Sequence, residues 1–185
     1  MRLDSFNNSD FERGRPYLFE GLWRAIEGLL FSSWIPGSRW RAALLRLFGA
    51  KVGQGVVFKP RIRVKFPWKL SIGDHSWIGE QVWIDNLAAV EIGSHCCISQ
   101  GAYLCTGNHR WDSQSFDLVV SPIRIEDHCW IGATARIGPG ITCAAGAVLT
   151  IGSTATRDLE QWHIHTGNPA KPIKVRPRTT RTNND

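Results

Sequence analysis

The chain has 185 residues, with 22 Lys and Arg against 16 Asp and Glu, so its formal net charge is +6. That length suits one domain with a core of its own, and the charge suits an anionic partner such as a phosphorylated cofactor, a nucleic acid or an acidic membrane surface. A transmembrane helix and a signal peptide are not expected, because no apolar run has the length or the flanks that either needs. The five cysteines contain no C-x-x-C pair, which favours reduced thiols and a cytoplasmic location.

Residues 1–51 are predicted to form an N-terminal extension with two amphipathic helices. The first opens at Pro16 and gathers its apolar side chains on one face, at Leu18, Leu22, Ile26, Leu29 and Leu30. The second runs from about Ser38 to Phe48, where arginines alternate with apolar residues. Two interpretations stay open for these helices: they cap the open end of the structure that follows, or they dock on a membrane surface.

An aliphatic residue followed by glycine recurs through residues 52–158, as at Val52-Gly53, Ile72-Gly73 and Ile131-Gly132. Most steps along the aliphatic series are six residues long, which fits neither a helix nor an alternating hairpin. Six residues fit a short strand and a corner, with the aliphatic side chain inside and the glycine letting the chain turn. The pattern predicts an all-β fold, a parallel β-helix of about five triangular coils. The inward positions are Val52, Phe58, Val64, Ile72, Ile78, Ile84, Ile92, Ile98, Leu104, Ile125, Ile131, Ile137, Cys143, Leu149 and Ala155.

Three interruptions of this repeat fall at the same corner of the triangle. Extra residues occur at 65–71, at 85–91 and in a long inserted loop at 106–124. Loops grouped on one face of a repeat scaffold are typical of a binding face. We therefore expect one edge of the solenoid to carry the chemistry.

His109 lies on the long loop and is the candidate general base, because a neutral imidazole has a pKa near the working pH. An ordinary surface histidine is the alternative. Asp85 and Asn86 begin the insertion one coil below, although Asn is also common as a turn residue. Phe66 and Trp68 lie one coil lower still, where aromatic faces beside polar groups suit a sugar.

Trp111 follows His109 and suits a loop that folds over an acceptor. His75, His95 and His128 each lie three residues after an inward position, which predicts a repeated corner. These three have no closely spaced partner, so we expect no metal site.

Residues 159–185 are predicted to be a C-terminal segment with a basic tail that is disordered from Thr179. The basic residues of this tail are not interleaved with aromatic residues, which argues against nucleic-acid binding. The sequence also has no Walker-type phosphate loop and no G-x-S-x-G elbow.

Several motifs together resemble those of the hexapeptide-repeat acyltransferases. They are the repeat, the loop histidine, Trp130-Ile131-Gly132, Thr156-Arg157-Asp158 and Gly167-Asn168-Pro169-Ala170-Lys171. The resemblance spans residues 52–175. Residues 41–50 (RAALLRLFGA), with Asp85-Asn86-Leu87, look like the subgroup of colanic-acid-type O-acetyltransferases.

The resemblance implies a left-handed β-helix, a homotrimer with active sites between subunits, and acetyl-CoA as co-substrate. It implies direct acetyl transfer to a hydroxyl of a saccharide or polysaccharide precursor, with His109 as general base, no acyl-enzyme and no metal. Asp85 and Asn86 match the acceptor-binding corner of that family. The residues that match the region lining the CoA arm are Trp130, Ala133, Ile151, Gly152, Thr156, Arg157 and Lys171, with Arg157 and Lys171 as phosphate contacts. Ile151 is bulkier than the alanine of many relatives at that position.

Other functions stay open at this stage. An N-acetyltransferase of an amino sugar would use the same histidine. A zinc-dependent solenoid of the carbonic-anhydrase type would need three converging histidines, and a non-catalytic scaffold would bind no CoA. The expected location is the cytoplasm, either free or at the inner face of the membrane.

Overall fold

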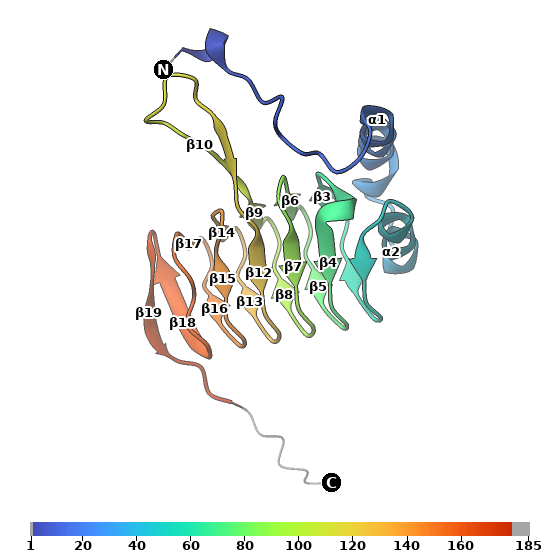
Figure 1. Cartoon of the computed structure of the whole chain (residues 1–185). Coiled ribbons are helices and arrows are strands. Elements are labelled where there is room, and N and C mark those ends of the chain that lie inside the picture. The colour runs from blue at the N-terminus through green and yellow to red at the C-terminus, as the bar shows by residue number, and fades with distance from the viewer. Residues whose placement is uncertain (1, 179–185) are drawn as a thin grey trace.

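A three-sided parallel β-solenoid forms the body of the computed structural model, which describes residues 2–178 (Figure 1). The coil is left-handed, as the resemblance implied. At its N-terminal end lie α1 (Tyr17–Ile26), its π-helical continuation η2 (Glu27–Phe31), and α2 (Ser38–Leu47). The tail from Thr179 lies outside the described residues. Within residues 2–178 no helix has both the length and the apolar character needed to cross a bilayer.

Each side of the solenoid is one sheet, and each coil adds one strand to every sheet. Sheet A contains β1 (Lys51–Val52), β4 (Leu70–Ile72), β7 (Val90–Ile92), β12 (Ile123–Ile125) and β15 (Thr142–Cys143). Sheet B contains β2 (Val57–Phe58), β5 (Trp77–Ile78), β8 (Cys97–Ile98), β13 (Trp130–Ile131), β16 (Val148–Leu149), β18 (His163–Gly167) and β19 (Ala170–Val175). Sheet C contains β3 (Arg63–Val64), β6 (Trp83–Asp85), β9 (Tyr103–Cys105), β14 (Arg136–Ile137) and β17 (Thr154–Ala155).

Five complete coils result, as the repeat predicted, and sheet B then continues. Strand β18 pairs in parallel with β16 and in antiparallel with β19, so a hairpin closes the C-terminal end of this sheet. The sequence pattern did not predict these two strands, because the six-residue repeat stops before them.

The predicted inward positions form the hydrophobic core. All of them are buried except Val52 in the first coil, which is half-buried. Strand pairing places equivalent positions of successive coils over one another, as with Ile72 beside Ile92 and Ile92 beside Ile125. Core packing is therefore mainly between neighbouring coils, as in other solenoids.

The glycines after the inward positions have a different role from the predicted one. Gly73 and Gly132 do not have a positive φ; the left-handed conformation comes two residues later, at His75 (φ 56°) and Thr134 (φ 56°). A Cβ on Gly73 would lie 2.6 Å from the backbone of Gly93. These glycines therefore let adjacent coils approach closely, rather than letting the chain turn.

His75, His95 and His128 occupy the left-handed position at the corner between sheets A and B, which confirms the predicted repeated corner. Their rings stack in a column, with centroids 5.3 Å apart in both neighbouring pairs. Stacked rings present their faces to one another instead of converging on a shared point. Residues 2–178 contain no group of three or more His, Cys, Asp or Glu side chains placed to hold a metal ion.

The two helices cap the first coil, as one of the two interpretations expected. The Trp23 indole N–H donates to the Val64 carbonyl oxygen at 2.8 Å, and Glu27 Oε1 accepts from the Val64 N–H at 3.1 Å. On sheet B the Ser38 hydroxyl accepts from the Phe58 N–H at 3.0 Å. On sheet A, Arg46 donates to the Val52 carbonyl oxygen at 2.9 Å. The open edge of each sheet is thus bonded by a helix side chain, which hinders pairing with another chain.

The apolar face predicted for the first helix is not the face that caps. Leu18, Leu22 and Leu29 are exposed, whereas Trp23 and Phe31 are buried against the solenoid. The periodicity grouped apolar side chains on one face, but it did not indicate which face packs on the solenoid. The actual capping stripe includes Glu27, a charged residue that periodicity assigns to the outside.

Replacing Glu27 with glutamine is expected to raise the melting temperature at pH 7. Burial raises the pKa of Glu27 above its ordinary value of 4.5, so the folded state disfavours the carboxylate. Protonated Glu27 therefore favours the folded state below pH 4.5, the ordinary pKa of the group. This contribution to stability is lost as the pH rises through the raised pKa of Glu27 in the folded protein. The glutamine oxygen still accepts the Val64 N–H, so the gain should appear at neutral pH and disappear near pH 4.

Thermal melts of the wild type and Glu27→Gln from pH 4 to pH 8 check this expectation. Glu80→Gln is the control, because Glu80 is exposed. If Glu27→Gln is less stable than the wild type at pH 7, the charged carboxylate of Glu27 stabilises the folded protein and the prediction is wrong.

Candidate active site

The three insertions all lie where the chain passes from sheet C to sheet A, as predicted. They occupy residues 65–69, 86–89 and 106–122, which we call the insertion edge. The first contains the short helix η3 (Pro67–Lys69). The third is an antiparallel hairpin of β10 (Gly107–His109) and β11 (Leu118–Val120), which projects from the solenoid body (Figure 1). The expected long loop is therefore an ordered arm.

His109 is the last residue of β10, and its imidazole is held in a defined orientation. Its Nδ1 lies 2.8 Å from the carbonyl oxygen of Phe116, and the His109 and Phe116 rings stack in parallel with centroids 4.2 Å apart. The Phe6 ring also contacts the His109 imidazole, with ring centroids 5.6 Å apart. A carbonyl oxygen can only accept, so Nδ1 carries the hydrogen, and in the neutral imidazole Nε2 then has the lone pair. Nε2 makes no hydrogen bond with residues 2–178.

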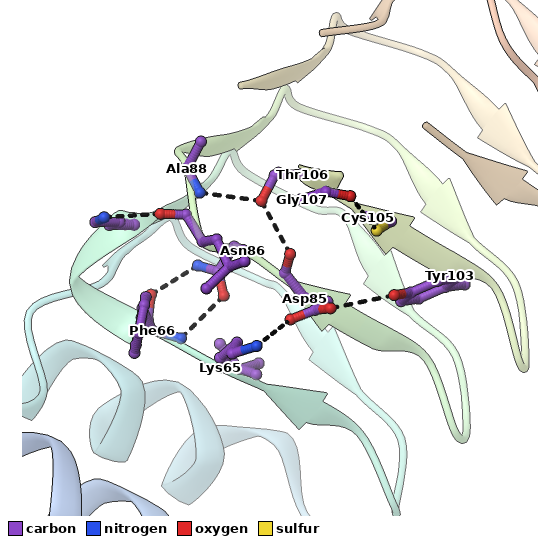
Figure 2. Close-up of polar contacts among 12 residues, drawn as sticks. Lys65, Phe66, Asp85, Asn86, Ala88, Tyr103, Cys105, Thr106 and Gly107 are labelled. Carbon is purple, nitrogen blue, oxygen red and sulfur yellow. Dashed lines mark hydrogen bonds and ion pairs between the residues drawn. The ribbon is translucent and has the colours of Figure 1, made fainter. Parts of the chain in front are cut away.

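Asp85 ends strand β6 and is at the centre of a small polar cluster (Figure 2). Its Oδ1 lies 3.0 Å from Lys65 Nζ, and its Oδ2 accepts from the Tyr103 hydroxyl at 3.1 Å. Burial, followed by the neighbouring Cys105 and Asp85, raises the pKa of Tyr103. The phenol therefore stays protonated and donates to Asp85. The Asp85 carboxylate is thus bonded by Lys65 and Tyr103 at the base of the hairpin.

Asn86 is fully buried, and its amide bonds to the backbone of the coil below (Figure 2). Its Oδ1 accepts from the Phe66 N–H at 2.9 Å, and its Nδ2 donates to the Phe66 carbonyl oxygen at 2.7 Å. One coil above, the Thr106 hydroxyl donates to the Asp85 carbonyl oxygen at 2.9 Å and accepts from the Ala88 N–H at 3.0 Å. Side chains thus replace the strand ladder where the insertions interrupt it.

Replacing Asn86 with alanine is expected to destabilise the fold by about 2 kcal/mol, because two buried backbone groups of Phe66 lose their partner. Chemical denaturation measures the free energy of unfolding. Asn108→Ala is the control, since Asn108 is exposed on the hairpin. Unchanged stability with lost turnover would assign Asn86 a direct role at the acceptor instead.

Phe66 and Trp68 are packed under the N-terminal segment rather than open to solvent. Phe66 stacks on Trp68 with ring centroids 4.9 Å apart and on Phe11 at 6.3 Å. The Trp68 indole N–H donates to the Arg13 carbonyl oxygen at 2.6 Å. Trp111 is 82% exposed near the end of the hairpin, away from this aromatic stack.

The N-terminal segment, the insertion edge and the hairpin line an open cavity of about 660 Å³. Its polar lining includes Asn7, Asp10, Lys69 and Asp117. Lys69 Nζ donates to the carbonyl oxygens of Glu12 (2.6 Å) and Leu87 (2.7 Å), and burial lowers its pKa. The sequence analysis did not name these residues, although Lys69 and Asp117 lie within predicted insertions.

The residues matched to the CoA arm lie on two different edges. Trp130, Ala133, Ile151 and Gly152 lie on sheet B or at the corner that follows it, where the Gly152 N–H donates to the Ala133 carbonyl oxygen at 2.9 Å. Ile151 is 74% exposed. The other matched residues follow sheet C or lie in β19: Thr156, Arg157 and Lys171, all exposed. One chain alone therefore does not bring all of them to His109.

Comparison with known proteins bears directly on this architecture. The chain is 41% identical over 179 residues to Escherichia coli WcaF, assigned as a colanic acid biosynthesis acetyltransferase, covering 96% of this chain and 98% of that protein. It is 30% identical to nodulation protein L of Rhizobium meliloti, covering 91% and 92%. This chain belongs to the hexapeptide-repeat acetyltransferases. Within that family it is similar to the colanic-acid type.

Solved structures agree with this membership. A hexapeptide-repeat acetyltransferase from Vibrio cholerae superposes with a TM-score of 0.78 at 27% identity, covering 88% of this chain and 95% of that one. The Vibrio cholerae protein in complex with acetyl coenzyme A gives a TM-score of 0.77 at 25% identity, covering 87% of each chain. No family model matches the chain. As a member of the family the protein is an acetyltransferase, as its motifs predicted.

Proposed function

We propose that this acetyltransferase moves the acetyl group of acetyl-CoA directly to a hydroxyl of a saccharide. The observation that carries the proposal is the hydrogen bond from His109 Nδ1 to the Phe116 carbonyl oxygen, which leaves Nε2 able to accept a proton. The acetyl-CoA complex of the Vibrio cholerae relative and the colanic acid assignment of WcaF support the donor and the acceptor class.

His109 Nε2 removes the proton of the acceptor hydroxyl while its oxygen attacks the thioester carbonyl carbon. Formation of the C–O bond gives a tetrahedral oxyanion, which a backbone N–H would stabilise. Its collapse breaks the C–S bond, and the imidazolium gives the proton to the leaving CoA sulfur. No acyl-enzyme forms, so Cys105 is not needed as a nucleophile; its thiol donates to the Gly107 carbonyl oxygen at 3.2 Å.

The cavity of about 660 Å³ on the insertion edge has groups that suit part of a saccharide acceptor, and His109 lies outside its lining on the same hairpin. Carboxylate and amide groups of Asp10, Asp117 and Asn7 can accept from and donate to sugar hydroxyls, and Phe11 offers an apolar face. Asp85 and Asn86 act behind this cavity by fixing the corner below His109. Phe66 and Trp68 support the Phe11 side of the cavity, and Trp111 is free to contact an acceptor longer than one sugar.

We propose a homotrimer, as the family resemblance implies; the division of the proposed CoA residues between two edges supports sites shared between subunits. Trp130, Ala133, Ile151 and Gly152 of one subunit would face His109 of the next, with Thr156, Arg157 and Lys171 near the CoA phosphates. The exposed indole of Trp130, whose N–H donates to Ser99 Oγ at 3.0 Å, would form part of that groove. The five free cysteines fit a cytoplasmic protein.

The test is a transfer assay with acetyl-CoA and a panel of mono- and oligosaccharides, including amino sugars. We expect release of free CoA and an ester-linked acetyl group on a sugar oxygen, which hydroxylamine removes. Hydroxylamine-stable acetylation of amino sugars alone would contradict O-transfer, and the absence of transfer to every carbohydrate would contradict the saccharide acceptor.

A further inference from the structure

The outer surface of α1 and of the segment after it is apolar. We call this surface the outer face; its side chains are Leu18, Leu22, Leu29, Leu30, Trp34 and Ile35. Leu18 is 90% exposed, Leu29 84% and Trp34 74%. The spacing of Leu18, Leu22 and Leu29 places them along one side of the helix. Isolated exposed leucines are ordinary, but a continuous apolar face of this kind marks an interaction surface.

The charges around the outer face have one sign. Between residues 13 and 48 there are only two carboxylates, Glu20 and Glu27. Glu20 is bonded to Arg13 at 2.9 Å, and Glu27 is buried under the helix. Arg24 is exposed although its Nε lies 3.9 Å from Glu20 Oε1, and Arg39 is exposed. A partner of this surface therefore has to be apolar where it meets the leucines and anionic around them.

We propose that the outer face docks on an anionic lipid bilayer. The leucines and Ile35 would enter the interfacial region, with Trp34 at the headgroup level, where tryptophan is favoured. Arg24 and Arg39 would meet lipid phosphates. A second copy of the chain fits this surface less well, because self-association would bring arginines together without an exposed carboxylate to pair with them.

The outer face lies on a helix that contacts the insertion edge, where the proposed active site is. Phe19 of α1 packs on Trp68 of the insertion edge, with ring centroids 5.7 Å apart. The N-terminal segment runs from the hairpin to α1 (Figure 1). A bilayer bound to the outer face would therefore lie beside the insertion edge. The proposal does not depend on the proposed reaction, because it concerns binding alone.

Vesicle flotation with the full-length protein tests the proposal. We expect flotation with vesicles of phosphatidylcholine and phosphatidylglycerol, and little flotation with phosphatidylcholine alone or in high salt. Leu18→Gln/Leu29→Gln should lower the affinity for the anionic vesicles by about tenfold or more, since the two leucines, even when only partly buried in the bilayer, together contribute more than the free energy of a tenfold change. Arg39→Gln should lower it less.

The matched control is Ile173→Gln/Val175→Gln, which removes two exposed apolar side chains from β19 at the other end of the solenoid. This variant should float like the wild type, and melting curves should show both double variants folded. Equal flotation of the two double variants would overturn the proposal, as would no flotation of the wild type. An oligomer that Leu18→Gln/Leu29→Gln dissociates, without flotation, would assign the face to a second copy instead.

Discussion

His109→Ala is expected to lower kcat by about 10²- to 10⁴-fold, which is the usual contribution of a general base. The KM for acetyl-CoA should change little, because in the proposed mechanism His109 acts on the acceptor hydroxyl and other residues hold CoA. Free CoA release with a saccharide acceptor measures the effect. The substitution removes the ring that stacks on Phe116, so a thermal melt must show that the solenoid remains folded.

His163→Ala is a matched control for this experiment. The Nδ1 of His163 also lies near a backbone carbonyl oxygen, that of Gln161 at 2.9 Å, but His163 is in β18 and away from the insertion edge. The control should keep wild-type turnover. If His109→Ala also keeps it, the proton is accepted by another group or by water, and the proposed mechanism is wrong.

The second large effect is expected on stability. A Cβ on Gly132 would lie 2.6 Å from Ile151 N and 2.7 Å from the carbonyl carbon of Thr150, both on the backbone of the next coil. The Gly132 N–H donates to the Leu149 carbonyl oxygen at 2.7 Å, so the coils cannot separate without losing ladder bonds. Gly132→Ala should cost about 3 kcal/mol. The melting temperature should fall by roughly 6–12 °C in a chain of this size.

Gly21→Ala supplies the comparison, because a Cβ on Gly21 in α1 has nothing within 4 Å. Alanine there should raise stability by up to about 1 kcal/mol through helix propensity. Calorimetry on both variants measures the difference. A Gly132→Ala protein with the melting temperature of the wild type would mean that the coils can move apart at this corner without loss of stability.

The repeat predicted the coils, their core positions and the edge of the insertions, because each follows from a period that one sequence contains. Residues whose position depends on contacts with distant parts of the chain could not be predicted from this period. Glu27 caps a strand edge through a bond to Val64, and nothing in the local pattern of α1 indicates that contact. The β18–β19 hairpin escaped prediction because it stops following the repeat.

Within the candidate site, the sequence pointed to His109 and to the aromatic and polar residues of the insertions. It did not indicate that Asn86 bonds to the coil below, because the side chain of an Asn at a corner can face either way. The cavity also depends on Asp10 and Phe11, which are far from the repeat in sequence. Only the folding back of the N-terminal segment brings them to the insertion edge.

That segment has a practical consequence for handling the protein. The Arg2 N–H donates to the Gln114 carbonyl oxygen of the hairpin at 2.8 Å, and Phe6 rests against His109. An affinity tag or fusion partner at the N-terminus would press on the arm that holds the proposed catalytic histidine. The β18–β19 hairpin pairs with β16 of sheet B and not with the arm, so an added sequence after it would leave the contacts of Arg2 and Phe6 undisturbed. Preparations tagged at the two ends should therefore not be treated as interchangeable when turnover is compared.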